Sequence, residues 1–254
     1  MGSCPPVVAS APAQALHHAV NSLLHEDRFP LSVVPHLILF FAGEKPAVRI
    51  VVKDRTLHKL RPKLNAMGYA SADAPIAVKQ IGPNWGQLEP VDPSSSSGPV
   101  LPTHRIVLIS QQKSCAAQIL EEEMSGESTE SGRQLGYPEC CVAAYPALAR
   151  SASDWPTVML SRSRPSLSVS MWCNRLSSLW GGACPTGELY PCSLRCSAAI
   201  QLGKRADALL RQHGFAHLAQ EILRQARRPL YLVNGEVVAG DIDHGRAREI
   251  VIHG

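Results

Sequence analysis

Six of the eight cysteines in this sequence lie between Cys140 and Cys196, and this is where residues able to do chemistry are most concentrated. Thiolates bind metal ions and also act as nucleophiles. A lone cysteine is often simply buried, so Cys4 and Cys115 need no functional explanation. A group of six is not expected from packing alone, and it predicts a site in which several thiolates act together.

Two segments of this region share one pattern, in which Tyr-Pro is followed by cysteine and by small, helix-forming residues. The first cysteine block reads LGYPECCVAAY over residues 135–145, and the second reads LYPCSLRCSAA over residues 189–199. Proline is favoured at the first position of a helix. Each block therefore predicts a helix start, with Cys140, Cys141 and Cys192 in the first helical turn.

A helix start favours the thiolate form of a cysteine, because its backbone N–H groups are unpaired and carry partial positive charge. Cys192 and Cys196 are four residues apart, so on a helix they would share one face and reach one centre. We therefore expect Cys140, Cys141, Cys192 and Cys196, here called the four-cysteine site, to bind one metal centre together.

An iron–sulfur cluster of the 4Fe–4S type is the centre that this pattern favours, because cysteine thiolates alone suffice as its ligands. If only three cysteines bind, the fourth iron is open to a substrate, and the protein would be an enzyme that does not use radicals. Cys173 and Cys184 would then be reserve ligands or a redox pair.

Two other kinds of protein fit the same cysteines. In the first, zinc takes four ligands and only stabilises a binding module. The spacing Cys192-x3-Cys196 followed by His213-x3-His217 resembles a stretched zinc finger, although that arrangement leaves the first cysteine block unused. In the second, a thiol redox protein cycles one pair of cysteines between thiol and disulfide.

Taken together, the blocks LGYPxCC and PCSxxCxA resemble an uncharacterised prokaryotic family, known as a domain of unknown function. The resemblance covers about residues 132–211. It implies that the members of the four-cysteine site belong together, and it implies no particular activity. The family often places a histidine just before the PCS block, whereas Leu189-Tyr190 stands there in this sequence.

Arg195, Ser193 and Ser197 lie inside the second cysteine block and are the other candidate site residues. The Arg195 guanidinium suits an anionic substrate, so we expect it to position one. The two serine hydroxyls are expected either to donate hydrogen bonds to cluster sulfurs or to serve as helix-cap or helix-surface groups. Ten Lys or Arg stand against three acids between residues 162 and 228, which permits a nucleic-acid partner but favours a small anionic molecule.

The composition, with 45% hydrophobic and 18% charged residues, is that of a globular chain and excludes a disordered one. The longest apolar run, residues 37–42, is too short to cross a membrane. The N-terminal residues lack the basic start and apolar stretch of a secretory signal. We therefore expect no membrane partner and a cytoplasmic location, where thiols stay reduced.

Residues 1–82 are expected to form a small α/β layer. The apolar pattern predicts helices over residues 12–25 and from Asp54 or Thr56 to Leu64, the second ending at Gly68. It predicts strands over residues 31–41, 47–52 and 76–81. Residues 83–103, rich in proline and with four serines in a row, are typical of a linker.

Residues 104–254 are expected to form a mainly helical domain that carries the cysteine motifs. A strand at 105–110, a helix at 116–123 and a polar loop at 126–132 come first, and helices follow at 139–149, 170–180, 192–213 and 215–227. Two apolar runs joined by Asn234-Gly235 predict a terminal β-hairpin, and residues 249–252 a last strand. The predicted fold class is mixed α+β.

Overall fold

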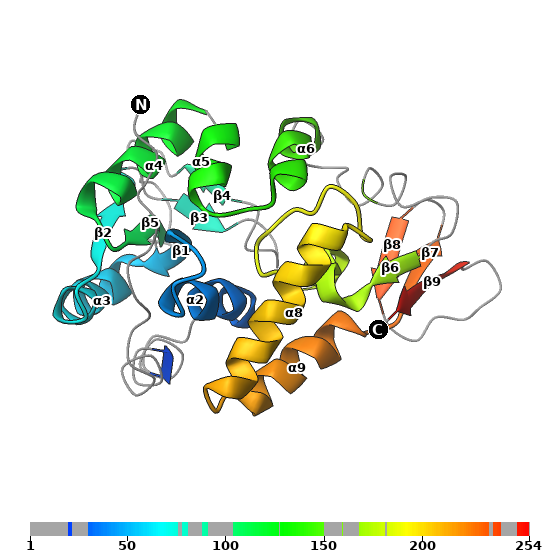
Figure 1. Cartoon of the computed structure of the whole chain (residues 1–254). Coiled ribbons are helices and arrows are strands. Elements are labelled where there is room, and N and C mark those ends of the chain that lie inside the picture. The colour runs from blue at the N-terminus through cyan, green and yellow to red at the C-terminus, as the bar shows by residue number, and fades with distance from the viewer. Residues whose placement is uncertain are drawn as a thin grey trace, which may run out of the picture. The chain divides into compact units, whose positions relative to one another are not determined.

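The structure is a computed structural model, and it shows the mixed α+β fold that the sequence predicts (Figure 1). It describes residues 20–21, 30–75, 78–80, 88–90, 104–126, 128–149, 159, 168–180, 182–233, 236–239 and 248–253. The chain folds into two compact units. Unit 1 contains Phe40–Gly136, and unit 2 contains Pro30–Leu39 together with Tyr137–Gly254.

An antiparallel sheet forms the centre of unit 1. Strand β1 (Ala47–Lys53) pairs along its whole length with β5 (His104–Ser110), and β2 (Ala70–Asp73) also pairs with β5. Strands β3 (Val78–Gln80) and β4 (Leu88–Pro90) complete the order β1-β5-β3-β4. The strands predicted at 47–52, 76–81 and 105–110 are present, whereas β2 and β4 were not predicted.

Three helices accompany this sheet, namely α3 (Asp54–Ala66), α4 (Lys113–Ser125) and α5 (Ser128–Gln134). Helix α3 ends just before Gly68 as predicted. Its N-cap is Lys53, which precedes the Asp54 or Thr56 expected to cap the helix, and the Lys53 side chain makes no capping hydrogen bond. The loop predicted over 126–132 was also wrong. Tertiary contacts give α5 its helical form despite its polar sequence, because Gln134 donates a 2.8 Å hydrogen bond to the buried carboxylate of Glu122.

The strand predicted over residues 31–41 is instead a short 3-10 helix, Leu31–Val33, that continues into α2 (Val34–Phe41). Every residue of α2 except Pro35 has an exposed fraction of 1% or less, and Pro35 is buried as well. An apolar run that is covered on all sides has no helical period, so its pattern is also that of a buried strand. Proline is tolerated here because it lies in the first helical turn.

Unit 2 is mainly helical, as predicted. Helices α6 (Glu139–Ala149) and α9 (Ala216–Ala226) lie where the sequence places them. The helix predicted over 170–180 is instead two 3-10 segments, η3 (Met171–Cys173) and η4 (Arg175–Trp180). The helix predicted to begin at Cys192 begins five residues later, as α8 (Ser197–Gln212). Helices α8 and α9 pack against one another (Figure 1).

A second, small sheet belongs to unit 2. The predicted terminal hairpin is formed by β7 (Leu230–Val233) and β8 (Glu236–Ala239), and the last predicted strand by β9 (Arg248–His253). Strand β6 (Ser168–Ser170) runs parallel to β9 and completes the order β6-β9-β7-β8.

Three sequence predictions fall mostly outside the described residues, namely the helix over 12–25, the linker over 83–103 and the turn at Asn234-Gly235. Among the residues that are described, no helix combines the length and the apolar character that crossing a membrane requires.

Candidate metal centre

The first cysteine block forms the start of α6, as its proline predicts. The Pro138 carbonyl accepts hydrogen bonds from the N–H groups of Cys141 (2.8 Å) and Val142 (3.0 Å). Helix α6 begins at Glu139, so Cys140 and Cys141 both lie in its first turn. The backbone N–H groups of that turn have no partner within the helix, which favours negative charge nearby.

The second cysteine block does not form the helix start that was expected at Pro191. Cys192 lies in a bend, and Cys196 is the residue that precedes α8 as its N-cap. The Cys196 N–H donates to the Ser193 carbonyl at 3.1 Å and closes the bend between them. The two cysteines therefore reach one centre from a loop and a helix start, and not from one helical face.

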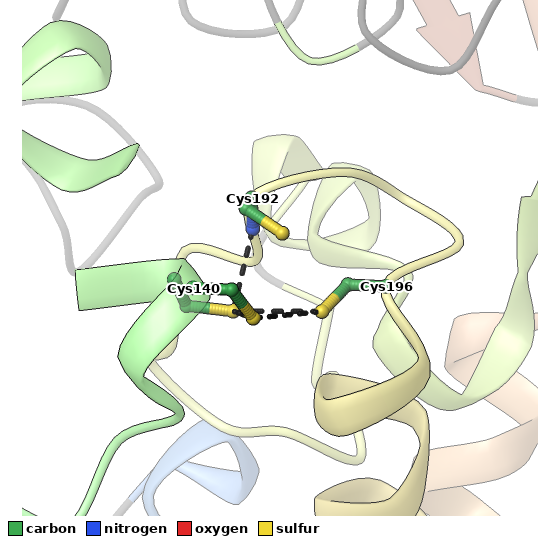
Figure 2. A group of neighbouring side chains, drawn as sticks. Cys140, Cys192 and Cys196 are labelled. Atoms are coloured by element: carbon green, nitrogen blue, oxygen red, sulfur yellow. Dashed lines mark hydrogen bonds between the residues drawn. The ribbon is translucent and has the colours of Figure 1, made fainter. Parts of the chain in front are cut away.

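The four thiols converge (Figure 2). The Cys140 and Cys196 sulfurs are 3.6 Å apart, the Cys141 and Cys196 sulfurs 3.7 Å, and the Cys140 and Cys141 sulfurs 3.9 Å. All four sulfurs lie within 4.8 Å of one another. The backbone N–H of Cys192 also donates to the Cys141 sulfur at 3.4 Å, which ties the second block to the first.

The site has a buried side and an open side. Cys141 and Cys196 are buried, Cys192 is half-buried and Cys140 is exposed. The buried side is apolar, with Cys173, Leu189 and Ala199 in the same cluster as Cys141 and Cys196. Metal could therefore enter past Cys140, while the inner sulfurs stay shielded from water.

Burial determines the protonation of most of these thiols. It raises the pKa of Cys141 well above its usual range, and it raises the pKa of Cys192 to about 12. Burial opposes ionisation of Cys196 too, but the Ala199 N–H and the neighbouring thiols outweigh it, so the pKa of Cys196 is lowered. The Cys196 thiolate is thus favoured, and ionisation of Cys141 and Cys192 is favoured only with a cation among the sulfurs, as happens when a metal binds.

The sulfur spacing meets the requirement of a metal ion. Zinc binds thiolate sulfur at about 2.3 Å, so the corners of a regular tetrahedron of sulfurs around it are about 3.8 Å apart. The three sulfur–sulfur distances of 3.6 to 3.9 Å are close to that value. The four-cysteine site is therefore a group of thiols able to hold a metal ion.

Three other residues singled out from the sequence, Arg195, Ser193 and Ser197, lie between or next to the cysteines of the second block. Arg195 is exposed in the bend between Cys192 and Cys196. Ser193 is half-buried, and Ser197 is exposed as the first residue of α8. Their expected roles toward a substrate or a cluster stay predictions. His213 and His217, at the end of α8 and on α9, are not part of the metal-binding group.

Cys173 and Cys184 are buried thiols that also lie outside that group. Burial raises the pKa of Cys173, and the nearby Cys184 adds to that effect. Burial likewise raises the pKa of Cys184, whose thiol forms a 3.0 Å hydrogen bond with the Thr186 hydroxyl. Burial therefore opposes ionisation of both thiols as it does for Cys141 and Cys192, so it is their position that sets them apart from the four-cysteine site.

His36 is a residue of unit 2 that the sequence patterns did not single out. Its imidazole is 1% exposed, and its Nε2 accepts a 2.6 Å hydrogen bond from the backbone N–H of Glu188. The sequence signal was present, since His36 is the one polar residue of the run VVPHLILFF. A polar side chain buried in such a run needs a partner, and that partner lies four residues before Cys192.

Residues 100–219 match a family of unknown function. The family model is described as "Protein of unknown function (DUF483)", and the matched segment contains the whole four-cysteine site. The resemblance to an uncharacterised family that the two cysteine blocks predict is thereby confirmed. Comparison with curated proteins and with solved structures gives no significant match.

Proposed function

We propose that the four-cysteine site binds one zinc ion and that this ion stabilises the fold of unit 2. The observation that carries the proposal is the sulfur spacing. The sulfurs of Cys140, Cys141 and Cys196 are 3.6 to 3.9 Å apart, and the Cys192 sulfur lies within 4.8 Å of each, which suits thiolates gathered on a single ion. Structural zinc sites use four protein ligands, whereas catalytic ones keep a position for water or substrate. Four thiolates and no weaker ligand favour the structural class.

The positions of the ligands in the chain support a stabilising role. Cys140 and Cys141 begin α6, and Cys196 begins α8, more than fifty residues further along the chain. A metal held by both helix starts would close a long loop, and its binding free energy would become folding free energy. The ion would also neutralise thiolates that are costly to bring together without it.

An iron–sulfur cluster, the centre favoured from the sequence, is the second candidate. Its support is the thiolate-only ligand set, which is also the set that binds 4Fe–4S clusters. A cluster binds each thiolate at a different iron, so the four sulfurs would have to move apart. For this candidate we propose that Arg195, exposed in the bend between Cys192 and Cys196, binds a small anionic substrate of an enzyme.

Anaerobic purification, followed by absorption spectroscopy and by analysis of zinc, iron and sulfide, separates these candidates. We expect a colourless protein with about one zinc per chain, the stoichiometry of a closed four-ligand site. Replacement of Cys196 by serine should abolish metal retention. Replacement of the buried Cys184 by alanine should leave the metal content unchanged, and it serves as the matched control.

A brown protein with iron and labile sulfide would replace the zinc proposal with the cluster. Protein that retains no metal under these conditions, and whose four thiols titrate rapidly, would contradict both candidates and favour thiol redox chemistry.

A further inference from the structure

The turn of residues 185–188 leads directly into the second cysteine block. It is closed by the Gly187 N–H, which donates to the Cys184 carbonyl at 2.7 Å, and by the Leu189 N–H, which donates to the Thr186 carbonyl at 3.3 Å. Only three residues separate Glu188 from Cys192. The position of this turn therefore affects where the Cys192 sulfur lies.

Two buried side chains hold the turn by its backbone. His36 Nε2 accepts from the Glu188 N–H at 2.6 Å, and the Arg175 guanidinium donates to the Gly187 carbonyl at 3.1 Å. The same guanidinium lies 4.6 Å from the centre of the Tyr190 ring, two residues before Cys192. A backbone N–H group and a backbone carbonyl of the turn are thus each held by a buried side chain.

Gly187 permits the close approach of His36. Its φ of +60° is a left-handed conformation that other residues seldom adopt. A Cβ atom at this position would lie 2.4 Å from His36 Nε2, which is a steric clash. The turn and the imidazole are therefore fitted to one another, and a larger residue at either position would disturb the other.

His36 also contacts the start of the first cysteine block. Its ring meets the Tyr137 ring edge to face, with 5.6 Å between the centroids and 66° between the planes. Tyr137 lies three residues before Cys140. One imidazole, from the part of α2 that belongs to unit 2, thus touches the start of the first cysteine block and the turn that leads into the second.

We propose that His36 is a positioning residue of the metal centre. It fixes the approach to Cys192 relative to the approach to Cys140, so that the four sulfurs lie at ligand spacing before the metal arrives. This inference rests on the proposed metal site. Because Nε2 accepts from a backbone N–H, the imidazole is neutral and carries its proton on Nδ1.

The test compares two substitutions of His36 in the full chain. His36→Gln keeps an acceptor at about the place of Nε2, whereas His36→Leu keeps the volume and removes the acceptor. Cobalt(II) titration reports binding through thiolate charge-transfer absorption, and zinc affinity follows by competition. Loss of groups that orient metal ligands usually costs about 10-fold to 100-fold in affinity. We expect a loss of that size for His36→Leu and near-normal affinity for His36→Gln.

Ile222→Ala provides the matched control for a general loss of stability, because Ile222 is a buried residue of α9 in the same unit. It should lower the unfolding midpoint and leave cobalt affinity unchanged. Equal affinity of His36→Leu and wild type would overturn the inference while leaving the metal site intact. A parallel loss in Ile222→Ala would overturn it too. Wild-type protein that binds neither cobalt nor zinc would instead overturn the proposed function.

A second measurement needs no substitution at all. Coupling between two sites is reciprocal, so a metal that depends on the His36 hydrogen bond must also stabilise that bond. Nitrogen-15 spectra of the histidine side chains should show an unprotonated His36 Nε2 in the metal-bound protein. Removal of the metal with a chelator should shift that signal. An unchanged His36 signal would contradict the positioning role.

Discussion

Cys140 and Cys196 differ in what surrounds their sulfurs, and this difference decides how much each can contribute to a bound metal. Cys196 is 7% exposed, precedes α8 and has a lowered pKa because the Ala199 N–H and the neighbouring thiols outweigh the effect of burial. Cys140 is exposed at the open side of the site. Water can reach the place of one sulfur and not that of the other.

We therefore expect Cys140→Ser and Cys196→Ser to differ in cobalt(II) and zinc titrations. Water can complete the coordination of an ion that has lost Cys140, so that variant should bind more weakly but measurably. Loss of Cys196 removes an inner ligand that water cannot replace, and binding should fall by at least another factor of about ten, or about 1.4 kcal/mol. Equal affinities of the two variants would contradict this ranking.

At the scale of elements, the sequence pattern located helix α9, which has one buried and one exposed face, within one residue of its predicted place. Strand β1, which is mostly buried, was located equally well. Helix α2 was mistaken for a strand because burial on all sides leaves no period. The members of the four-cysteine site were recognised from their spacing, although Cys192 reaches the site from a bend that the sequence pattern did not indicate.

Contacts between elements that are distant in sequence could not be predicted in this way. The hydrogen bond between His36 and Glu188 joins residues that are 152 positions apart, and nothing in either segment specifies the other. The packing contact of Gly203 could not be predicted from the sequence either, because its residue type indicates only a poor helix former. In the structure, Gly203 lets α8 approach the backbone of η3 closely.

Gly203→Ala distinguishes helix propensity from packing. Propensity alone predicts that alanine in α8 stabilises the protein by about 1 kcal/mol. A Cβ atom at this position would lie 2.2 Å from the Trp172 carbonyl oxygen, so α8 or η3 must shift. We expect a net destabilisation of about 2 kcal/mol from overpacking, measured by urea unfolding. Ala208→Gly on the exposed face of α8 is the control, and a Gly203→Ala variant more stable than wild type would disprove this packing account.

At the scale of the whole molecule, all ligands of the proposed metal belong to one of the two units. Unit 2 contains both cysteine blocks and also Pro30–Leu39, which brings His36 to them. The boundary between the units falls within α2. Its residues Leu37 and Ile38 belong to unit 2, whereas Phe40 and Phe41 belong to the buried core of unit 1. A metal that stabilises folding through its ligands should therefore act on the stability of unit 2 alone.

Removal of the metal should thus affect the two units differently, and hydrogen exchange can measure both at once. A ligand present at about a thousand times its Kd stabilises the folded state by about 4 kcal/mol, so chelation should remove roughly that much protection. We expect faster exchange in α6 and α8, whose first turns carry the ligands, and unchanged exchange in the paired strands β1 and β5 of unit 1. Restoring zinc should restore protection in α6 and α8. Equal loss of exchange protection in both units would show that the metal stabilises the whole chain. Unchanged protection in both units would rule out a structural role for the metal, because an ion that stabilises a fold must slow the opening of the helices that hold it.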